Sequence, residues 1–311
     1  IVGLGVLGTS IGIALRAATR EIPVMGHDPD PERVARAKRL GAIDQSHWNL
    51  ISACEDADLI VLDVPFAEIE PTLVALRQDL KEGVVVLDTA PLKVPVLEVM
   101  RRVLPAGTAY VGGHVVAPAL GVGPVEPSAD LLREATFLLV VPEDAPAYAA
   151  ERASDLALAV GASPHYVDAL EHDGIVAVTA QLPVLGALAM AGVIDGAPGG
   201  QGRGEFYGSE LSALGAIVLG EEVHSIEALN ANREHLLPWL DSLIAALQRE
   251  RDLLAEDAEG LATLVSDGRS AVRRWSAEGE EADETTRPTA AAVWRDLLLG
   301  GLGRRTRPSR G

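Results

Sequence analysis

Six residues near the start of the chain, Gly3-Leu4-Gly5-Val6-Leu7-Gly8, decide the fold. They form the pattern Gly-x-Gly-x-x-Gly between an apolar entry, Ile1-Val2, and a run with helical spacing, residues 10–18. In this context the first glycine permits a tight turn, the second lets the backbone approach a pyrophosphate, and the third lets the helix pack closely on the strand. The helix N-terminus then presents N–H groups to the phosphates. The stretch predicts a dinucleotide-binding turn, with Gly3, Gly5, Val6, Leu7 and Gly8 as cofactor-binding residues.

An acidic residue, Asp28, follows Gly8 by twenty residues, just after a second apolar run at 22–26. An acid at this distance hydrogen-bonds the adenosine ribose hydroxyls in dinucleotide sites. Because a carboxylate repels a 2′-phosphate, we expect NAD, while His27 and Arg33 nearby keep NADP possible. The alternative is a glycine turn without a ligand, with Asp28 capping a helix.

The first half of the chain alternates short apolar runs with runs of helical spacing. The expected strands are 22–26, 59–64, 84–88, 109–112, 137–141 and 165–167, and the expected helices are 31–40, 67–80, 94–104 and 145–160. Continuous apolar strands indicate a sheet buried on both faces. Residues 1–168 are therefore expected to form an α/β Rossmann domain with a doubly wound, mostly parallel sheet. We also expect a few residues upstream of Ile1, because a strand usually needs about five residues.

Strand patterns end after residue 168, and long helical runs follow at 175–191, 210–219, 225–256 and 258–275. Pro238 should kink the third run or mark the first turn of a new helix. We expect an all-α substrate and dimerisation domain at 169–276. Residues 277–311 are expected to be a mobile acidic linker and basic tail, with a short helix at 289–299.

Composition excludes several classes of protein. The 311 residues carry a net charge of −19, which argues against nucleic acid and anionic membranes as partners. A single cysteine, Cys54, excludes an internal disulfide framework and fits the cytoplasm. No His or Cys pair has the spacing of metal ligands, so no metal is expected. Residues 175–194 are uncharged and long enough to span a membrane, but polar residues, proline and glycine interrupt them, so a buried helix is expected.

Three segments should lie at the carboxyl ends of strands, where ligands bind in open α/β sheets. They are Asp63-Val64-Pro65, the stretch 88–93 that contains Thr89 and Lys93, and Gly112-Gly113-His114. An imidazole with a pKa near 6.5 suits proton removal from an alcohol that is being oxidised, so His114 is the candidate base. A structural histidine bonded to a backbone carbonyl is the equal alternative. Farther along, His172-Asp173 opens the second half, where Asp173 could cap a helix or take part in catalysis.

Together these segments resemble the prephenate/arogenate dehydrogenase family of tyrosine biosynthesis. The similarity runs from residue 1 to about Trp275 and adds Glu171-His172-Asp173 and 266–273 to the segments already quoted. It implies a homodimer through the helical domain and hydride transfer to NAD(P) with loss of carbon dioxide. It also implies that His114 assists deprotonation of the substrate's 4-hydroxyl. Val64, Pro65 and Thr89 would contact the cofactor, and Lys93, His172 and Arg203 the small-molecule substrate.

The substrate half departs from the family pattern. Pro91 replaces a serine that touches substrate and histidine, and Gln181 and Val184 replace two histidines. The family's substrate-binding arginine is missing from 208–213, although Arg203 could compensate. Two alternatives to prephenate or arogenate oxidation therefore stay open: the same chemistry on another hydroxy acid, or a non-catalytic NAD-binding regulatory protein.

Overall fold

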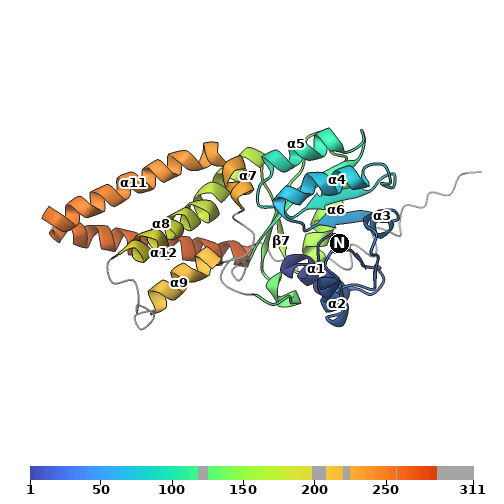
Figure 1. Cartoon of the computed structure of the whole chain (residues 1–311), viewed down its shortest axis with the longest axis horizontal. Coiled ribbons are helices and arrows are strands. Elements are labelled where there is room, and N and C mark those ends of the chain that lie inside the picture. Colours follow the sequence, from blue (N-terminus) through green and yellow to red (C-terminus); the bar gives the residue numbers. More distant parts are fainter. Residues whose placement is uncertain (118–124, 198–207, 220–224, 257, 286–311) are drawn as a thin grey trace, which may run out of the picture.

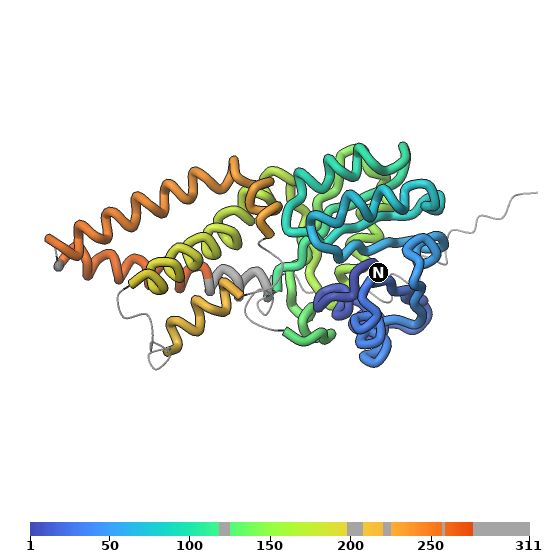
Figure 2. The backbone as a smooth tube through the Cα atoms, viewed as in Figure 1, coloured from blue at the N-terminus to red at the C-terminus, as the bar shows by residue number. Residues whose placement is uncertain are grey.

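The computed structural model describes residues 1–117, 125–197, 208–219, 225–256 and 258–285, and for 258 and 276–285 it describes the backbone alone. Figure 1 shows an elongated molecule in which a sheet with its covering helices lies at one end and a group of helices at the other. The tube in Figure 2 shows that the first half of the chain builds the sheet end and the second half the helical end.

The sheet is mostly parallel, as predicted. Its main part has the order β3-β4-β5-β6-β7. The β5–β6 pair is antiparallel and the other pairs are parallel, so β6 and β7 run opposite to β3, β4 and β5. A parallel pair, β1-β2, adjoins it through Val2, which bridges both His27 and Leu62. The bounds are β1 Met25–Gly26, β2 Gln45–Ser46, β3 Leu59–Leu62, β4 Val85–Asp88, β5 Ala109–Val116, β6 Thr136–Val140 and β7 Ser163–Tyr166. The glycine turn therefore follows a central segment of the sheet.

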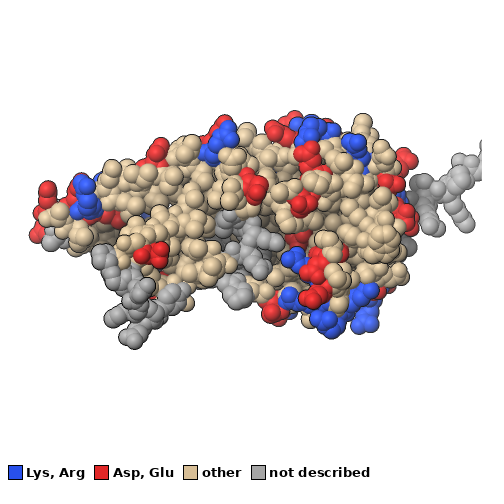
Figure 3. Space-filling model, viewed as in Figure 1, with Lys and Arg blue, Asp and Glu red and all other residues tan. Residues whose placement is uncertain are grey.

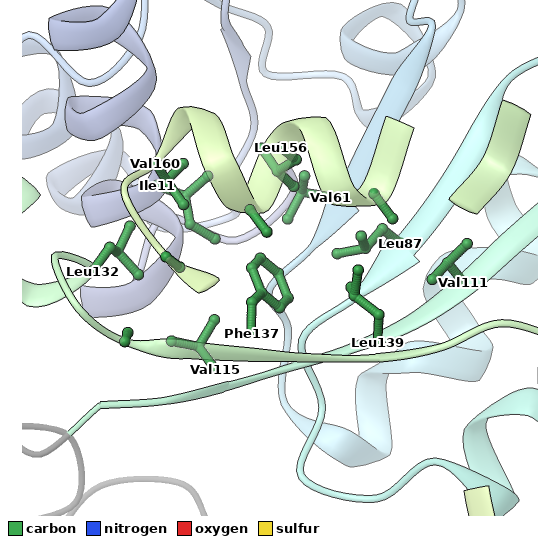
Figure 4. Close-up of a cluster of buried hydrophobic side chains, with 14 of the residues drawn as sticks. Ile11, Val61, Leu87, Val111, Val115, Leu132, Phe137, Leu139, Leu156 and Val160 are labelled. Atoms are coloured by element: carbon green, nitrogen blue, oxygen red, sulfur yellow. The ribbon is translucent and has the colours of Figure 1, made fainter. Parts of the chain in front are cut away.

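Helices cover both faces of the sheet, which makes it doubly wound. One face packs on α1 (Val6–Ala18) and α6 (Ala147–Ala159), with Phe137 in the middle of the cluster (Figure 4). The other face packs on α3 (Leu50–Cys54), α4 (Ile69–Leu76) and α5 (Val94–Val103). The remaining elements of this half are α2 (Pro31–Arg39), η1 (Phe66–Glu68) and η2 (Ala129–Leu131).

Several boundaries differ from the expectation. The strand expected at 22–26 is reduced to Met25–Gly26, and β2 and α3 were not expected. The more consequential difference is β5, which continues to Val116 because β6 pairs with its second half. His114 therefore lies within a strand, opposite Leu138, rather than after the end of one.

The second half is helical throughout its described residues. Its elements are α7 (Ala169–Val176), a π-helical turn η3 (Ala177–Gln181), α8 (Leu182–Gly196), α9 (Ser209–Leu219), α10 (Ile226–Ala231), α11 (Arg233–Glu256) and α12 (Ala258–Thr285). The single helix expected at 225–256 breaks at Asn232, and Pro238 lies inside α11. The linker expected from 277 is wrong up to Thr285, where α12 ends. The short helix expected at 289–299 and the basic tail lie outside the described residues.

The continuous stretch Ala169–Gly196 is the one helix in the described residues that is long and apolar enough to cross a membrane. The prediction that it is buried is wrong for the single chain, since 28% of its most apolar window is buried. Its apolar residues surround the whole helix, while neighbouring helices cover only part of it. Leu188, Met190 and Val193 are examples of large apolar residues that remain exposed.

Candidate functional site

The glycine turn has the geometry that its sequence predicts. Gly3 has φ +93°, and a Cβ there would lie 1.8 Å from the carbonyl oxygen of Asp63. A Cβ on Gly8 would lie 2.2 Å from the carbonyl oxygen of Gly3, so α1 can approach the first strand only without a side chain here. Because α1 begins at Val6, its first N–H groups have no acceptor within the helix. This cradle fits the pyrophosphate of a dinucleotide.

Asp28 is held at the edge of the same turn. Its two carboxylate oxygens accept the backbone N–H groups of Leu4 and Asp30, each at 2.8 Å. The alternative of Asp28 as a helix cap is wrong, because Asp30 caps α2 by accepting the N–H of Glu32. Each oxygen of Asp28 retains a further lone pair, so the expected contact with ribose hydroxyls is compatible with these bonds.

The next strand end brings an additional residue to the turn. Asp63, directly after β3, accepts the N–H of Gly8 at 2.6 Å and the hydroxyl of Thr89 at 2.7 Å. Val64 is partly buried, and Pro65 immediately precedes η1. Sequence reasoning had named the segment but not the Asp63 side chain. The position of Asp63, directly after a strand that neighbours the segment before the glycine turn, could have indicated that its side chain reaches the turn.

A hydrogen-bonded chain of three side chains forms the centre of the candidate active site. The Nδ1 atom of His114 lies 2.8 Å from Nε2 of His172, and Nδ1 of His172 lies 2.7 Å from a carboxylate oxygen of Asp173. His172 and Asp173 are buried, whereas His114 retains partial exposure. The chain thus runs from the buried junction of the two halves toward the surface at β5.

The chain fixes which nitrogen of His114 is free. The ionised carboxylate of Asp173 can only accept, so Nδ1 of His172 carries a hydrogen. In the tautomer in which Nε2 of His172 carries no hydrogen, this atom accepts the Nδ1–H of His114, which leaves Nε2 of His114 without a hydrogen. Burial, followed by the neighbouring His172 and Lys93, lowers the pKa of His114 to about 3. At neutral pH His114 is accordingly an uncharged imidazole, and the lowered pKa makes it a weaker base than a free histidine side chain.

Asp173 also joins the two halves of the molecule. Its carboxylate accepts the N–H groups of Lys93 and Val94, at 2.7 and 2.9 Å, at the start of α5. Its carbonyl oxygen accepts the side-chain amide of Asn232 at 2.9 Å. The suggestion that Asp173 caps its own helix is wrong, because Asp168 caps α7 through the N–H of Leu170. Asp173 instead satisfies the N-terminus of α5 across the junction.

Lys93 was expected to contact the substrate, and its burial contradicts that expectation. Its side chain is 0% exposed, and its ammonium donates to a carboxylate oxygen of Asp88 and to the carbonyl of Gly113 at 2.6 Å. Burial lowers the pKa of Lys93 and raises that of Asp88, while their mutual attraction opposes both shifts. Since Gly113 precedes His114, Lys93 anchors the strand that carries the candidate base.

The other substrate predictions also change. His172 is 0% exposed and hydrogen-bonds both His114 and Asp173, so its ring supports the candidate base and has no exposed surface for a ligand. Arg203 lies outside the described residues. Gln181 is buried and accepts the amide of Asn232 at 2.7 Å, so it packs the helices together. Among the described residues, no group of His, Cys, Asp and Glu has the arrangement of a metal site.

Comparison with known proteins places these features in a family. The model of the prephenate dehydrogenase nucleotide-binding domain matches residues 11–165. Cyclohexadienyl dehydrogenase of Zymomonas mobilis is 27% identical over 262 residues, covering 82% of this chain and 87% of that protein. A probable prephenate dehydrogenase, NovF of Streptomyces niveus, is 29% identical over 271 residues, covering 86% of this chain and 72% of that protein.

Solved structures agree in fold. Prephenate dehydrogenase from A. aeolicus, crystallised with hydroxyphenyl propionate and NAD+, has a TM-score of 0.76 at 20% identity, covering 88% of this chain and 96% of its own. Synechocystis arogenate dehydrogenase has a TM-score of 0.70 at 20% identity, covering 88% and 98%. At 20% identity these solved structures show the shared fold. The family model and the sequence relatives show that the chain belongs to the prephenate/arogenate dehydrogenase family.

Proposed function

We propose that this protein oxidises the ring 4-hydroxyl of a cyclohexadienol, prephenate or arogenate, with NAD+ and with loss of carbon dioxide. The observation that carries the proposal is the His114–His172–Asp173 chain, in which His114 lies on β5, the central strand of the sheet. The glycine turn follows Val2, which bridges to β3 of the same sheet. A base and a dinucleotide cradle on one sheet are the two elements that hydride abstraction from an alcohol requires.

The residues of the chain divide the chemistry between them. When bound, the nicotinamide supplies the hydride acceptor. Gly3 and Gly8 permit the tight turn and the close packing of α1, Gly5 leaves room for the pyrophosphate, and Asp28 would bind the adenosine ribose. The Nε2 atom of His114 takes the hydroxyl proton, because its Nδ1–H is already committed to His172. Asp173 stabilises the hydrogen-bonded chain as positive charge develops on the imidazole.

The departures at the substrate side have structural consequences. Gln181 makes internal hydrogen bonds and Val184 is buried, so neither replaces the missing histidines as a ligand for an anion. Charge recognition must therefore differ from that of relatives with the family pattern. These observations favour, as a second candidate, the same hydride chemistry on another hydroxy acid.

The test is NADH formation followed by absorbance, with prephenate, arogenate and a panel of hydroxy acids. We expect turnover with prephenate or arogenate and loss of turnover in His114→Ala. Turnover confined to another hydroxy acid would replace the proposed substrate but keep the chemistry. NAD+ binding without turnover of any substrate would contradict catalysis and support a regulatory protein.

The helical half also supports a homodimer, which we propose as the working form in the cytoplasm. Exposed apolar side chains lie on three of its helices: Val193 on α8 (74% exposed), Leu254 on α11 (73%) and Trp275 on α12 (67%). On the face seen in Figure 3, this half carries wide areas without charged residues. Covering such apolar surface is the usual reason for subunit association.

A further inference from the structure

Asp63 introduces a negative charge into the centre of the dinucleotide cradle. One carboxylate oxygen accepts the N–H of Gly8, the third residue of α1, at 2.6 Å. The other accepts the hydroxyl of Thr89, which follows β4, at 2.7 Å. A Cβ on Gly5 would lie 3.7 Å from this carboxylate, so the side chain faces the turn itself. Two hydrogen bonds fix a charge where helix dipoles usually attract anions.

Three features of the proposed site indicate which part of a bound cofactor would lie next to Asp63. Asp28 marks the adenosine ribose, the glycine turn marks the pyrophosphate, and His114 marks the ring that exchanges hydride. In the sheet, Val2 precedes the turn, β3 precedes Asp63, β4 precedes Thr89, and β5 carries His114. Asp63 therefore lies between the pyrophosphate position and the base, along the nicotinamide riboside.

We propose that Asp63 is a specificity-determining residue that makes the site prefer the oxidised cofactor over the reduced one. This inference rests on the proposed NAD site. The oxidised nicotinamide ring is a cation and the reduced ring is neutral, while the rest of the two cofactors is identical. A fixed carboxylate attracts the positive ring of NAD+ and has no such charge attraction to the neutral ring of NADH. The same carboxylate repels the pyrophosphate of both NAD+ and NADH, and in NADH nothing offsets this repulsion. In NAD+ the attraction between the carboxylate and the positive nicotinamide ring offsets it.

The experiment measures dissociation constants of NAD+, NADH and ADP-ribose by calorimetry for the full chain and for Asp63→Asn and Asp63→Ser. ADP-ribose carries the adenosine and the pyrophosphate without the ring, so it reports repulsion alone. We expect both variants to bind NADH and ADP-ribose more tightly by similar factors. The dissociation constant of NADH divided by that of NAD+ should fall about fivefold in both variants. This is the effect expected from removing one screened negative charge several ångströms from the nicotinamide ring.

The matched control is Asp58→Asn. Asp58 lies just before β3, at the opposite end of that strand from Asp63, and its exposed side chain pairs with Lys81. Asp58→Asn therefore removes the same negative charge, but at a site far from the cradle. We expect this variant to keep all three constants. Thermal melting checks that each variant is folded.

Several results would overturn the proposal. Equal changes in all three constants would show that Asp63 acts on the phosphates alone, and unchanged constants would show that it acts on neither. A shift in only one of the two uncharged variants would show that side-chain shape, and not charge, is the cause. Failure of the unaltered chain to bind NAD+ would overturn both proposals, whereas binding without turnover would count against the proposed function only.

Discussion

At the scale of single residues, His172 acts through another side chain. In the proposed mechanism its Nε2 atom, 2.8 Å from Nδ1 of His114, accepts the hydrogen on that Nδ1 and leaves Nε2 of the proposed base unprotonated. We expect His172→Leu to lower kcat by about 100-fold with little change in KM, because general-base catalysis contributes roughly 10²–10⁴-fold. His172→Gln, whose amide oxygen can accept the same hydrogen, should recover part of the loss. Equal losses in the two variants would show that His172 only fills space.

The protonation of His114 gives a prediction for stability. Its pKa in the folded protein is about 3, against 6.5 for the free side chain. Between these values the unfolded chain binds a proton that the folded chain does not, so stability falls as the pH drops below about 6.5. The loss by pH 5 should be at most about 2 kcal/mol, since solvent reaches part of the residue. Urea unfolding at pH 7 and pH 5 should show this loss, and His114→Asn should reduce it; an unchanged difference in the variant would refute the assignment.

At the scale of elements, the contact between α1 and the first strand depends on the absence of side chains. A Cβ on Gly8 would meet both the carbonyl of Gly3, at 2.2 Å, and the carboxylate of Asp63, at 2.9 Å. We expect Gly8→Ala to displace α1, to destabilise the fold by about 1–3 kcal/mol, and to weaken NAD+ binding. Calorimetric titration and thermal melting measure the two effects.

A helical glycine elsewhere provides the matched control. A Cβ on Gly186, in α8, would meet a side-chain carbon of Leu243 at 3.7 Å, an ordinary contact. Gly186→Ala should leave NAD+ binding unchanged and keep or raise stability by up to about 1 kcal/mol, because alanine is the better helix former. If Gly8→Ala bound NAD+ as tightly as this control, the turn would not be the pyrophosphate site.

At the scale of the whole molecule, the exposed apolar surface of the helical half predicts self-association. Light scattering after gel filtration should give about twice the chain mass of 32.6 kDa. Val193→Glu should shift the protein toward the monomer, because a buried carboxylate without a partner is costly. Val74→Glu, on the partly exposed α4 of the sheet half, is the control that should stay dimeric. A monomeric unaltered chain would contradict the proposal.

The sheet half was predictable because its signals are local. Continuous apolar runs, the glycine spacing and an acid at a fixed distance each depend on neighbours in the sequence, and the structure confirms the parallel, doubly wound sheet that they indicate. Boundaries were less certain where tertiary pairing decides them. β5 extends past Gly112 only because β6 lies antiparallel beside it, and that pairing joins residues distant in the chain.

The candidate site shows the same division. Residue type and spacing alone predicted the glycine turn, the acid at Asp28 and His114 as a candidate base. The structure gives the turn the expected geometry, and the roles of Asp28 and His114 stay predictions. The contacts of Lys93, His172 and Asp173 depend instead on how the chain folds. The tertiary structure places Lys93 against Asp88 beneath the strand and makes His172 and Asp173 the support of His114. Those contacts arise from burial and from hydrogen bonds between residues up to 80 positions apart, which local sequence patterns do not encode.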